Sequence, residues 1–495
     1  MKSFFIKTFS HNGQYNIILK KFNKQNLLTD NSSMGKSKNT KNQKIEKLLA
    51  MANDKSTSEN EAKIARKKAA QLYKENKVDH YQIDTSKEIV KYSDSKKGKK
   101  SLRMKKSTLL GIIGVVAGIA IIVSTVCIVR TIKKRIEDRT IRVAFYGLSE
   151  DKCELLKKYI PQEENIILEF DTISEGSFDL AVVKQKYDML FTWKGEITSS
   201  LAEGAEDIPQ RVLETMPQSL RDKKCVPILL DHCEFSYRED LLKKTGFDNP
   251  PASFNSFKDY LNSAKGIVFS PFFCNGAEDR ILIDFTGALV MANGGLNAYN
   301  KLTEELKKVS SLDEIIDVDL NGQNFTLRSA LDIVKEWPKQ GLTHPSWFNG
   351  RGNDLLYFAE DGQLGVFFTL LSEHRKIPYN VIKNYETFLV PPNFDGSNYG
   401  LIAPAISCML ISDNQNCKRY IANFFTEDAQ AELSNQTNLG PVHYRAQAYD
   451  RQADDVRFWA ASCKGGAVPD LYLGVYQRKP EELAKMCTEI RNYVR

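Results

Sequence analysis

Hydrophobic and polar positions follow a different pattern in each successive part of the chain. Residues 1–40 are polar, rich in Lys and Asn and without periodicity, which predicts a disordered basic tail. Residues 41–84 carry apolar side chains at helical spacing in two stretches, which predicts a small helical hairpin. Residues 85–107 read as a basic linker. The two apolar stripes of the hairpin are Ile45, Leu48, Leu49 and Ala52, followed by Ala62, Ala65, Ala69, Leu72 and Tyr73.

One long apolar run follows the linker. Residues 108–129 are 22 positions without a charged side chain. At about 1.5 Å per residue they span roughly 33 Å, enough for a hydrocarbon core of about 30 Å. The run is longer than the apolar part of a cleaved signal peptide, and no small-x-small cleavage site follows it. We therefore predict a transmembrane helix at residues 108–130 that acts as an uncleaved signal anchor, with cleavage as the alternative.

The cations that flank this run indicate its orientation. More Lys and Arg residues precede it, between residues 96 and 106, than follow it, between residues 130 and 135. Cytoplasmic flanks carry the excess of positive charge in membrane proteins. We expect the N-terminus in the cytoplasm and the long C-terminal part outside the cell membrane. The sequence leaves open whether the protein starts at Met1, Met34 or Met104.

From residue 139 to residue 495 short apolar strands alternate with helical patterns, which is typical of an α/β sheet domain. The first strands are expected at residues 141–146, 166–170 and 187–191. Such sheets bind ligands just beyond the carboxyl ends of their strands. This rule singles out Tyr146 and residues 192–196.

The formal charge of +7 conceals two parts of opposite sign. Residues 1–107 contain 26 Lys and Arg against 10 Asp and Glu, a net charge of +16, whereas the remaining residues, with 43 basic and 52 acidic side chains, are at −9. The basic part precedes a membrane span, where Lys and Arg can contact anionic headgroups. We therefore predict a membrane contact and no nucleic-acid partner.

The C-terminal part contains several motifs that follow one another in a characteristic order. They run from residue 187 to residue 442 and read YDMLFTWKGEITSSLAEG, VPILLDHCEFSYRED, GALVMANGGLNAYNKL, FAEDGQLGVFF and KRYIANFFTEDAQAELSNQTNLGPV. In this order they resemble the extracellular solute-binding proteins of ABC importers, a group that includes maltose- and other sugar-binding proteins. Residues 41–80, with KIEKLLAMA and EAKIARKKAAQLY, resemble a small helical-hairpin family of unknown function.

The resemblance implies a type 2 periplasmic-binding fold with two lobes that close on a ligand by hinge motion. Lobe 1 would take residues 141–228 and 390–445, and lobe 2 residues 233–385 and 446–495. The expected partners are a small-molecule solute, with sugar favoured, and ABC permease subunits. Peptide, polyamine, another solute or a lost ligand are the alternatives. The rival function is a membrane sensor or scaffold that has a solute-binding-like ectodomain and a cytoplasmic docking hairpin.

Candidate ligand-binding residues combine this resemblance with the strand-end rule. Tyr146, Trp193 and Glu196 follow predicted strands, and Trp193 lies where the family carries an aromatic side chain that stacks on sugar rings. Asp231 occupies the hinge strand, where a carboxylate without a partner would be costly to bury. The remaining candidates, weighed against a core role, are Phe272 and Phe273 after a strand at residues 266–270, and Tyr444 after the Gly440–Pro441 turn. The family's Gly-x-Trp element after residues 366–371 is missing.

The sequence predicts no enzyme, no cofactor and no metal site. Its six His residues are scattered without the short spacings that metal ligands use, and no G-x-S-x-G turn is present. Eight of nine Cys residues lie beyond the apolar run, with Cys225/Cys233 and Cys408/Cys417 the nearest pairs. Disulfides and buried free thiols both remain open, because spacing alone does not fix the pairing.

Overall fold

The computed structural model describes Lys68, residues 82–84 and 89–91, Glu137, and residues 139–174, 177–393 and 399–495. The chain divides into two compact units, residues 1–118 and 119–495, and each is described by itself. In the first, β1 (Gln82–Asp84) pairs antiparallel with β2 (Ile89–Lys91), a small sheet that the sequence did not predict. The predicted tail, most of the hairpin and the transmembrane helix lie outside the described residues.

A six-stranded sheet is the centre of what we call the six-strand half of the second unit. Its order is β13-β6-β12-β5-β3-β4, in which β3 runs parallel to β4 and β5 while the other pairs are antiparallel. The strands are β3 (Thr140–Tyr146), β4 (Ile167–Ile173), β5 (Met189–Trp193), β6 (Val226–Leu230), β12 (Ala405–Leu410) and β13 (Gly440–Pro441). Its helices are α4 (Glu150–Lys157), α5 (Leu180–Lys186), α6 (Glu196–Leu201), α7 (Gln210–Leu213), α15 (Gln415–Tyr420), α16 (Glu427–Thr437) and α17 (Arg451–Ser462).

The first three predicted strands are confirmed with shifted ends. The third begins at Met189 and not at Tyr187. Tyr187 is the C-cap of α5, and the Asp188 carboxylate accepts a hydrogen bond from the Arg142 N–H of the neighbouring strand at 2.8 Å. The end of α5 at Tyr187 and the hydrogen bond of Asp188 therefore set the start of this strand, which an apolar run alone does not show.

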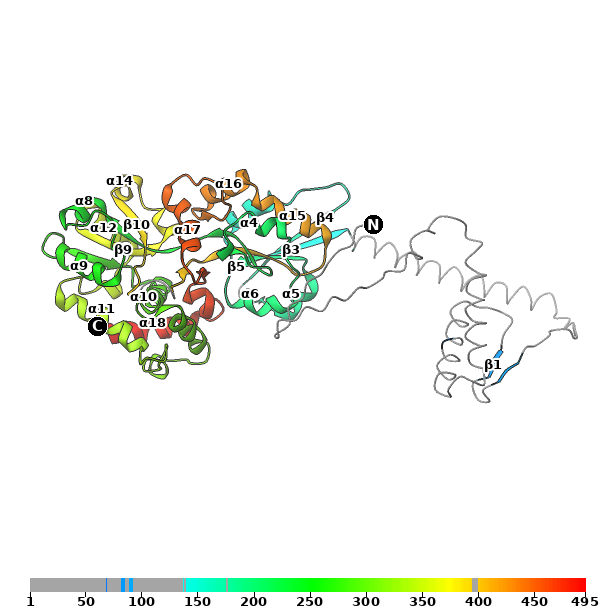
Figure 1. The fold of residues 1–495 in the computed structure, drawn as a ribbon, viewed down its shortest axis with the longest axis horizontal. Coiled ribbons are helices and arrows are strands. Elements are labelled where there is room, and N and C mark those ends of the chain that lie inside the picture. The colour runs from blue at the N-terminus through cyan, green and yellow to red at the C-terminus, as the bar shows by residue number, and fades with distance from the viewer. Residues whose placement is uncertain are drawn as a thin grey trace, which may run out of the picture. The chain divides into compact units, whose positions relative to one another are not determined.

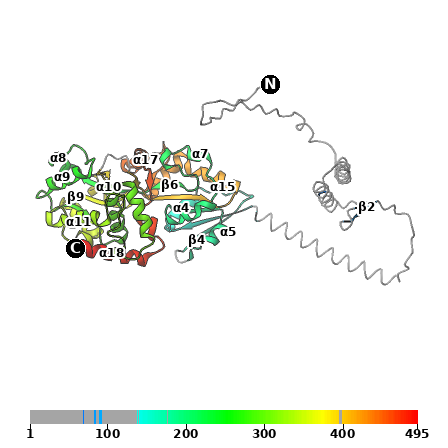
Figure 2. The same cartoon turned by 60° about the horizontal axis from the view of Figure 1, so that its bottom comes forward.

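A four-stranded sheet is the centre of the four-strand half, which occupies the opposite end of the unit in Figures 1 and 2. Its order is β10-β7-β9-β8, with only β8 and β9 parallel. The strands are β7 (Cys233–Arg238), β8 (Ser270–Cys274), β9 (Leu364–Leu370) and β10 (Tyr385–Leu389). The helices are α8 (Glu239–Lys244), α9 (Phe254–Ala264), α10 (Asp279–Leu306), α11 (Leu327–Gln340), α12 (Gly352–Glu360), α13 (Leu371–His374), α14 (Tyr379–Ile382) and α18 (Pro480–Val494).

Glycine and capping residues shape the helices of this half. Helix α10 is interrupted at its glycine pair, where Gly295 has φ 79° and ψ −177°. Helix α11 has Thr326 as its N-cap, whose side chain accepts from the Ser329 N–H, and Gly341 in the left-handed region as its C-cap.

The strand that carries Phe272 and Phe273 differs from the prediction. We expected it at residues 266–270, but β8 is Ser270–Cys274, so both phenylalanines lie within it. Successive side chains of a strand point to opposite faces. Phe272 accordingly packs in the main core and Phe273 in a separate cluster with Phe367 and Tyr385.

The chain passes from the first sheet to the second through Asp231 and His232 alone, between β6 and β7. It returns after β10, and β11 (Leu401–Ile402) then pairs in parallel with β14 (Ala467–Val468). Beyond β14 a single π-helical turn, η7 (Tyr472–Tyr476), leads into α18. We call residues 470–478 the C-terminal segment. It lies between the two halves, because its π-helical turn contacts α6 on one side and α10 and α18 on the other.

The eight cysteines in the described residues are all buried free thiols. Burial raises the pKa of Cys233, Cys274 and Cys408 well above that of an ordinary thiol, which lowers their reactivity. We expect a thiol reagent to label none of the eight in the native protein and all of them after denaturation. Mass spectrometry of the labelled chain measures this, and a mass that corresponds to a Cys225–Cys233 or Cys408–Cys417 disulfide would contradict it.

Candidate functional site

The loop after β5 carries two of the predicted binding residues. Trp193 ends the strand half-buried, and Glu196 is the first residue of α6. Its Oε2 atom is buried and has no hydrogen-bond partner among the described residues. Tyr146, at the end of the parallel strand β3, is opposite Thr192 in the register, so the structure brings Tyr146, Trp193 and Glu196 to one edge of the sheet.

The chain's own C-terminal segment covers this edge. A Cβ atom added to Gly195 would lie 2.2 Å from the Leu473 carbonyl oxygen, so the two backbones are in direct contact. Gly147, with φ +64°, approaches the Gln477 side-chain amide just as closely, at 2.8 Å from such a Cβ. The carboxyl ends of β3 and β5, where the sequence rule places a ligand, therefore contact residues 473–477.

Arg280, near the start of α10, extends toward the same place. The carbon of its guanidinium lies 5.8 Å from the ring centre of Trp193 and 5.1 Å from that of Tyr472. Its Nη2 donates to Asp470 Oδ2 at 3.2 Å, and its Nε lies 3.6 Å from Asp284 Oδ2. Both carboxylates are fully buried, whereas a third of the arginine side chain is exposed.

The single guanidinium of Arg280 only partly balances the two buried carboxylates of Asp284 and Asp470. Burial, and then repulsion from Asp470, raise the pKa of Asp284 well above its usual value. Burial alone would lower the pKa of Arg280, but the carboxylates of Asp470, Asp284 and Asp231 outweigh that effect and raise it. The guanidinium is therefore permanently charged and serves as the counter-ion of this cluster.

Asp231 lies on the crossing between the halves and is 1% exposed. Its carboxylate accepts hydrogen bonds from the Ser372 hydroxyl at 2.6 Å, the Ser372 N–H at 3.0 Å and the His232 N–H at 2.9 Å. Burial raises its pKa although these donors lower it. These hydrogen bonds attach the crossing between the halves to the start of α13, directly after β9.

Of the remaining candidates, Phe272 and Phe273 lie inside the core and Tyr444 lies apart from this edge. Phe272 and Phe273 are 0% and 1% exposed, which supports the core alternative for both. The Tyr146 ring is also buried, with its centre 4.6 Å from that of Phe178. Tyr444 is 45% exposed, and its N–H donates to the Thr215 carbonyl, on another part of the six-strand half.

Sequence reasoning missed Arg280, Asp284, Asp470 and Tyr472. A signal for the first two was present, because two charges four residues apart interrupt an otherwise apolar helical run and would be neighbours on one helix face. Asp470 and Tyr472 carried no comparable signal, since only the folded chain brings the C-terminal segment to α10.

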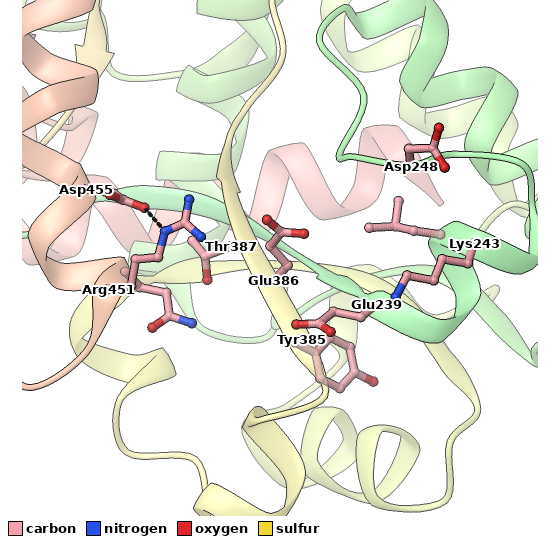
Figure 3. A pocket seen from close by; sticks show the side chains of 10 residues that line it. Glu239, Lys243, Asp248, Tyr385, Glu386, Thr387, Arg451 and Asp455 are labelled. Carbon is pink, nitrogen blue, oxygen red and sulfur yellow. Dashed lines mark ion pairs between the residues drawn. The ribbon is translucent and has the colours of Figure 1, made fainter.

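Two hollows lie elsewhere on the domain, and the first of them lies between the halves. One of about 300 Å³ is bordered by β10, α8 and α17 (Figure 3). Its charged lining residues are Glu239, Lys243, Asp248, Glu386, Arg451 and Asp455. Another of about 250 Å³ is lined by the Lys194–Asp222 ion pair and by residues of β6, β12 and β14.

The hollow of Figure 3 gives a pH-dependent prediction. Burial, and then repulsion from Glu239, raise the pKa of Glu386 above its usual 4.5. A carboxyl group whose pKa is raised by folding contributes stability below its unfolded pKa, and this contribution is lost as the pH rises through the folded pKa. Glu386→Gln should therefore leave stability unchanged at pH 4 and raise it by about 0.5 kcal/mol at pH 7.5, as measured by urea unfolding. The exposed Glu203→Gln is the matched control, and a loss of stability in Glu386→Gln at pH 7.5 would refute the sign.

Neither a metal site nor an exposed membrane helix is found in the part of the chain that the structure describes. Among those residues there is no group of three or more His, Cys, Asp or Glu side chains that could hold a metal. Within the same residues, α10 alone is long and apolar enough to cross a membrane, and 78% of its apolar window is buried in the domain.

Comparison with known proteins gives results for both parts of the chain. Residues 43–80 match the family described as a protein of unknown function, DUF2786. No curated protein matches the chain. Among solved structures, the bacterial solute receptor AcbH, described as preferring β-D-galactopyranose, is 13% identical with a TM-score of 0.55, over 72% of this chain and 96% of its own.

Two further solved structures give the same result. Apo RafE of Streptococcus pneumoniae is 12% identical with a TM-score of 0.53, over 72% of this chain and 93% of its own. The binding protein MsmE of Bacillus subtilis, in an open conformation, is 13% identical with a TM-score of 0.52, over 72% of this chain and 96% of its own. The described domain thus has the mixed α/β fold of these solute-binding proteins.

Proposed function

We propose that this chain is a membrane-anchored, extracytoplasmic solute-binding protein that captures a small solute, carbohydrate by preference, for an ABC transporter. The observation that carries the proposal is the solute-binding fold together with Trp193 at the carboxyl end of β5. An aromatic face at that position suits the C–H-rich face of a sugar ring. The sugar class is further supported by the preference described for AcbH.

The anchor rests on residues 108–130 and on the cations that precede them. A C-terminal alkaline phosphatase fusion is active only outside the cytoplasm, and a C-terminal green fluorescent protein is bright only inside. We expect an active phosphatase fusion and a dark fluorescent fusion. The reverse pattern would refute the proposed location of the domain.

Solute capture is tested with the purified full chain and a panel of mono- and oligosaccharides, peptides and polyamines. A solute at 100 times its dissociation constant stabilises the native state by about 2.7 kcal/mol, which is readily seen as a rise in melting temperature. We expect at least one carbohydrate to produce this rise, and Trp193→Ala to reduce it. A panel without any response would remove the support for transport.

A sensor or scaffold is the second candidate, and one observation favours it. The edge that would hold the solute contacts the chain's own residues 473–477. A domain in that state retains the fold of a receptor while presenting a fixed surface to a partner. If the chain is a sensor or scaffold, we expect the domain outside the cytoplasm in the fusion experiment and no response to the solute panel. The two experiments together therefore separate the two candidate functions.

A further inference from the structure

The face of Trp193 is covered by a side chain of the protein itself. The Arg280 guanidinium lies over this ring and over that of Tyr472, at 5.8 and 5.1 Å from their centres. A cation over an aromatic face is attracted by the ring's negative potential, and more strongly when water is excluded. The arginine comes from α10 in the four-strand half, whereas Trp193 belongs to β5 in the six-strand half. The contact therefore joins the two halves.

Buried carboxylates hold the arginine in this position. Asp470 accepts from its Nη2 at 3.2 Å and Asp284 lies 3.6 Å from its Nε. The same carboxylates accept backbone N–H groups of the C-terminal segment, Asp284 from Tyr472 at 3.1 Å and Asp470 from Leu473 at 2.7 Å. The two carboxylates thus bind both Arg280 and the C-terminal segment, and they hold the two together.

The segment in turn closes on the six-strand half. Leu473 presents its carbonyl to Gly195, Gln477 reaches Gly147, and the Arg478 guanidinium lies 5.4 Å from the ring centre of Phe178. The contact of Leu473 with Gly195 leaves no room there for even one added methyl group. A solute ring cannot enter between Trp193 and Tyr472 unless Arg280 and this segment move.

We infer that Arg280 is an internal occupant of the site, which keeps the two halves closed on each other when no solute is bound. Solute receptors of this fold close by hinge motion around their ligand. Here the chain's own guanidinium provides the closing contact. A solute then binds only to the fraction of molecules in which Arg280 has left Trp193, which weakens its apparent affinity by that fraction.

Two polar atoms indicate that this closed state is reversible. Glu196 Oε2 and Gln477 Oε1 are buried without a hydrogen-bond partner among the described residues. A buried polar atom left unpaired is unfavourable. Opening exposes both atoms to water, so it recovers hydrogen bonds that closure forgoes.

Closure is measurable in the full chain without knowledge of the ligand. Spin labels are introduced as non-natural amino acids at the exposed Glu203, next to α6, and the exposed Glu336, in α11, so that the native cysteines take no part. Pulsed electron–electron double resonance then gives the distribution of distances between the two labels, one in each half. We expect one narrow distance in the unmodified sequence, and an open-to-closed ratio raised about tenfold or more in Arg280→Gln and Arg280→Met.

Arg328→Gln is the matched control, because Arg328 forms an exposed ion pair with Asp317 away from Trp193. It should leave the distribution unchanged. Trp193→Ala removes the ring but retains the arginine and its carboxylates, so it tests the same contact if the Arg280 variants do not fold. A mainly open population in the unmodified chain, or an unchanged distribution in Trp193→Ala, would overturn the inference. A solute panel without a response would refute solute capture but not closure.

Discussion

Phe272→Ala is expected to lower the free energy of unfolding by about 3–5 kcal/mol, the usual loss for removing a buried phenylalanine ring. Phe272 is fully buried, and its ring centre lies 5.1 Å from that of Trp337 and 5.3 Å from that of Phe285. The surrounding strands and helices cannot collapse fully into the space left by the ring. All four tryptophans lie within residues 139–495, so urea unfolding followed by tryptophan fluorescence reports on this domain even in the full chain.

Phe269 provides the matched control for this substitution. Its side chain is 59% exposed, only one residue before β8. Phe269→Ala should change the free energy of unfolding by less than about 0.5 kcal/mol. If Phe272→Ala instead retained its stability and lost the response to a solute, the ring would be part of a binding platform, as the sequence first suggested.

Arg375→Ala is expected to lower the free energy of unfolding by about 2–4 kcal/mol. The side chain leaves the end of α13 in the four-strand half and is only 7% exposed. Its Nη1 donates to the carbonyls of Ser434 and Leu439, at 3.1 and 3.4 Å, and its Nε lies 2.7 Å from Asp450 Oδ2. Removing it takes one donor from the carbonyls of Ser434, in the last turn of α16, and of Leu439, and it removes the ion pair of the Asp450 carboxylate at the start of α17. Urea unfolding by tryptophan fluorescence measures the loss.

A control for charge and a control for position accompany this experiment. Arg375→Lys keeps the charge but has one ammonium in place of a planar fork, so an intermediate loss is expected. The exposed Arg445→Ala should be close to neutral. Equal stabilities of Arg375→Ala and Arg445→Ala would show that these contacts between the halves contribute nothing.

The pattern of the sequence predicted local elements well where local interactions decide them. Strand β3, for example, follows from a short apolar run at residues 141–146. The end of a strand was harder to predict, as β8 shows, because Phe272 and Phe273 look the same in sequence whether they belong to a strand or follow it. Their opposite faces become distinct only when the packing of each face is known.

The candidate site was predicted in part. The strand-end rule found Tyr146, Trp193 and Glu196, which β3 and β5 bring to one edge because parallel neighbouring strands end together. It could not find Asp470 or Tyr472, which reach Arg280 from about 190 residues further along the chain. The resemblance also suggested Asp231, whose carboxylate accepts hydrogen bonds from Ser372 and His232 in the structure.

The sequence by itself determined that this chain joins a basic N-terminal part, an apolar run long enough to cross a membrane and an α/β domain, because charge, hydropathy and periodicity are local properties. Only the tertiary structure decided what covers Trp193. That depends on where two elements of the domain, the start of α10 and the turn after β14, come together. Such a meeting is fixed by the packing of the whole domain, and no pattern within either segment specifies it.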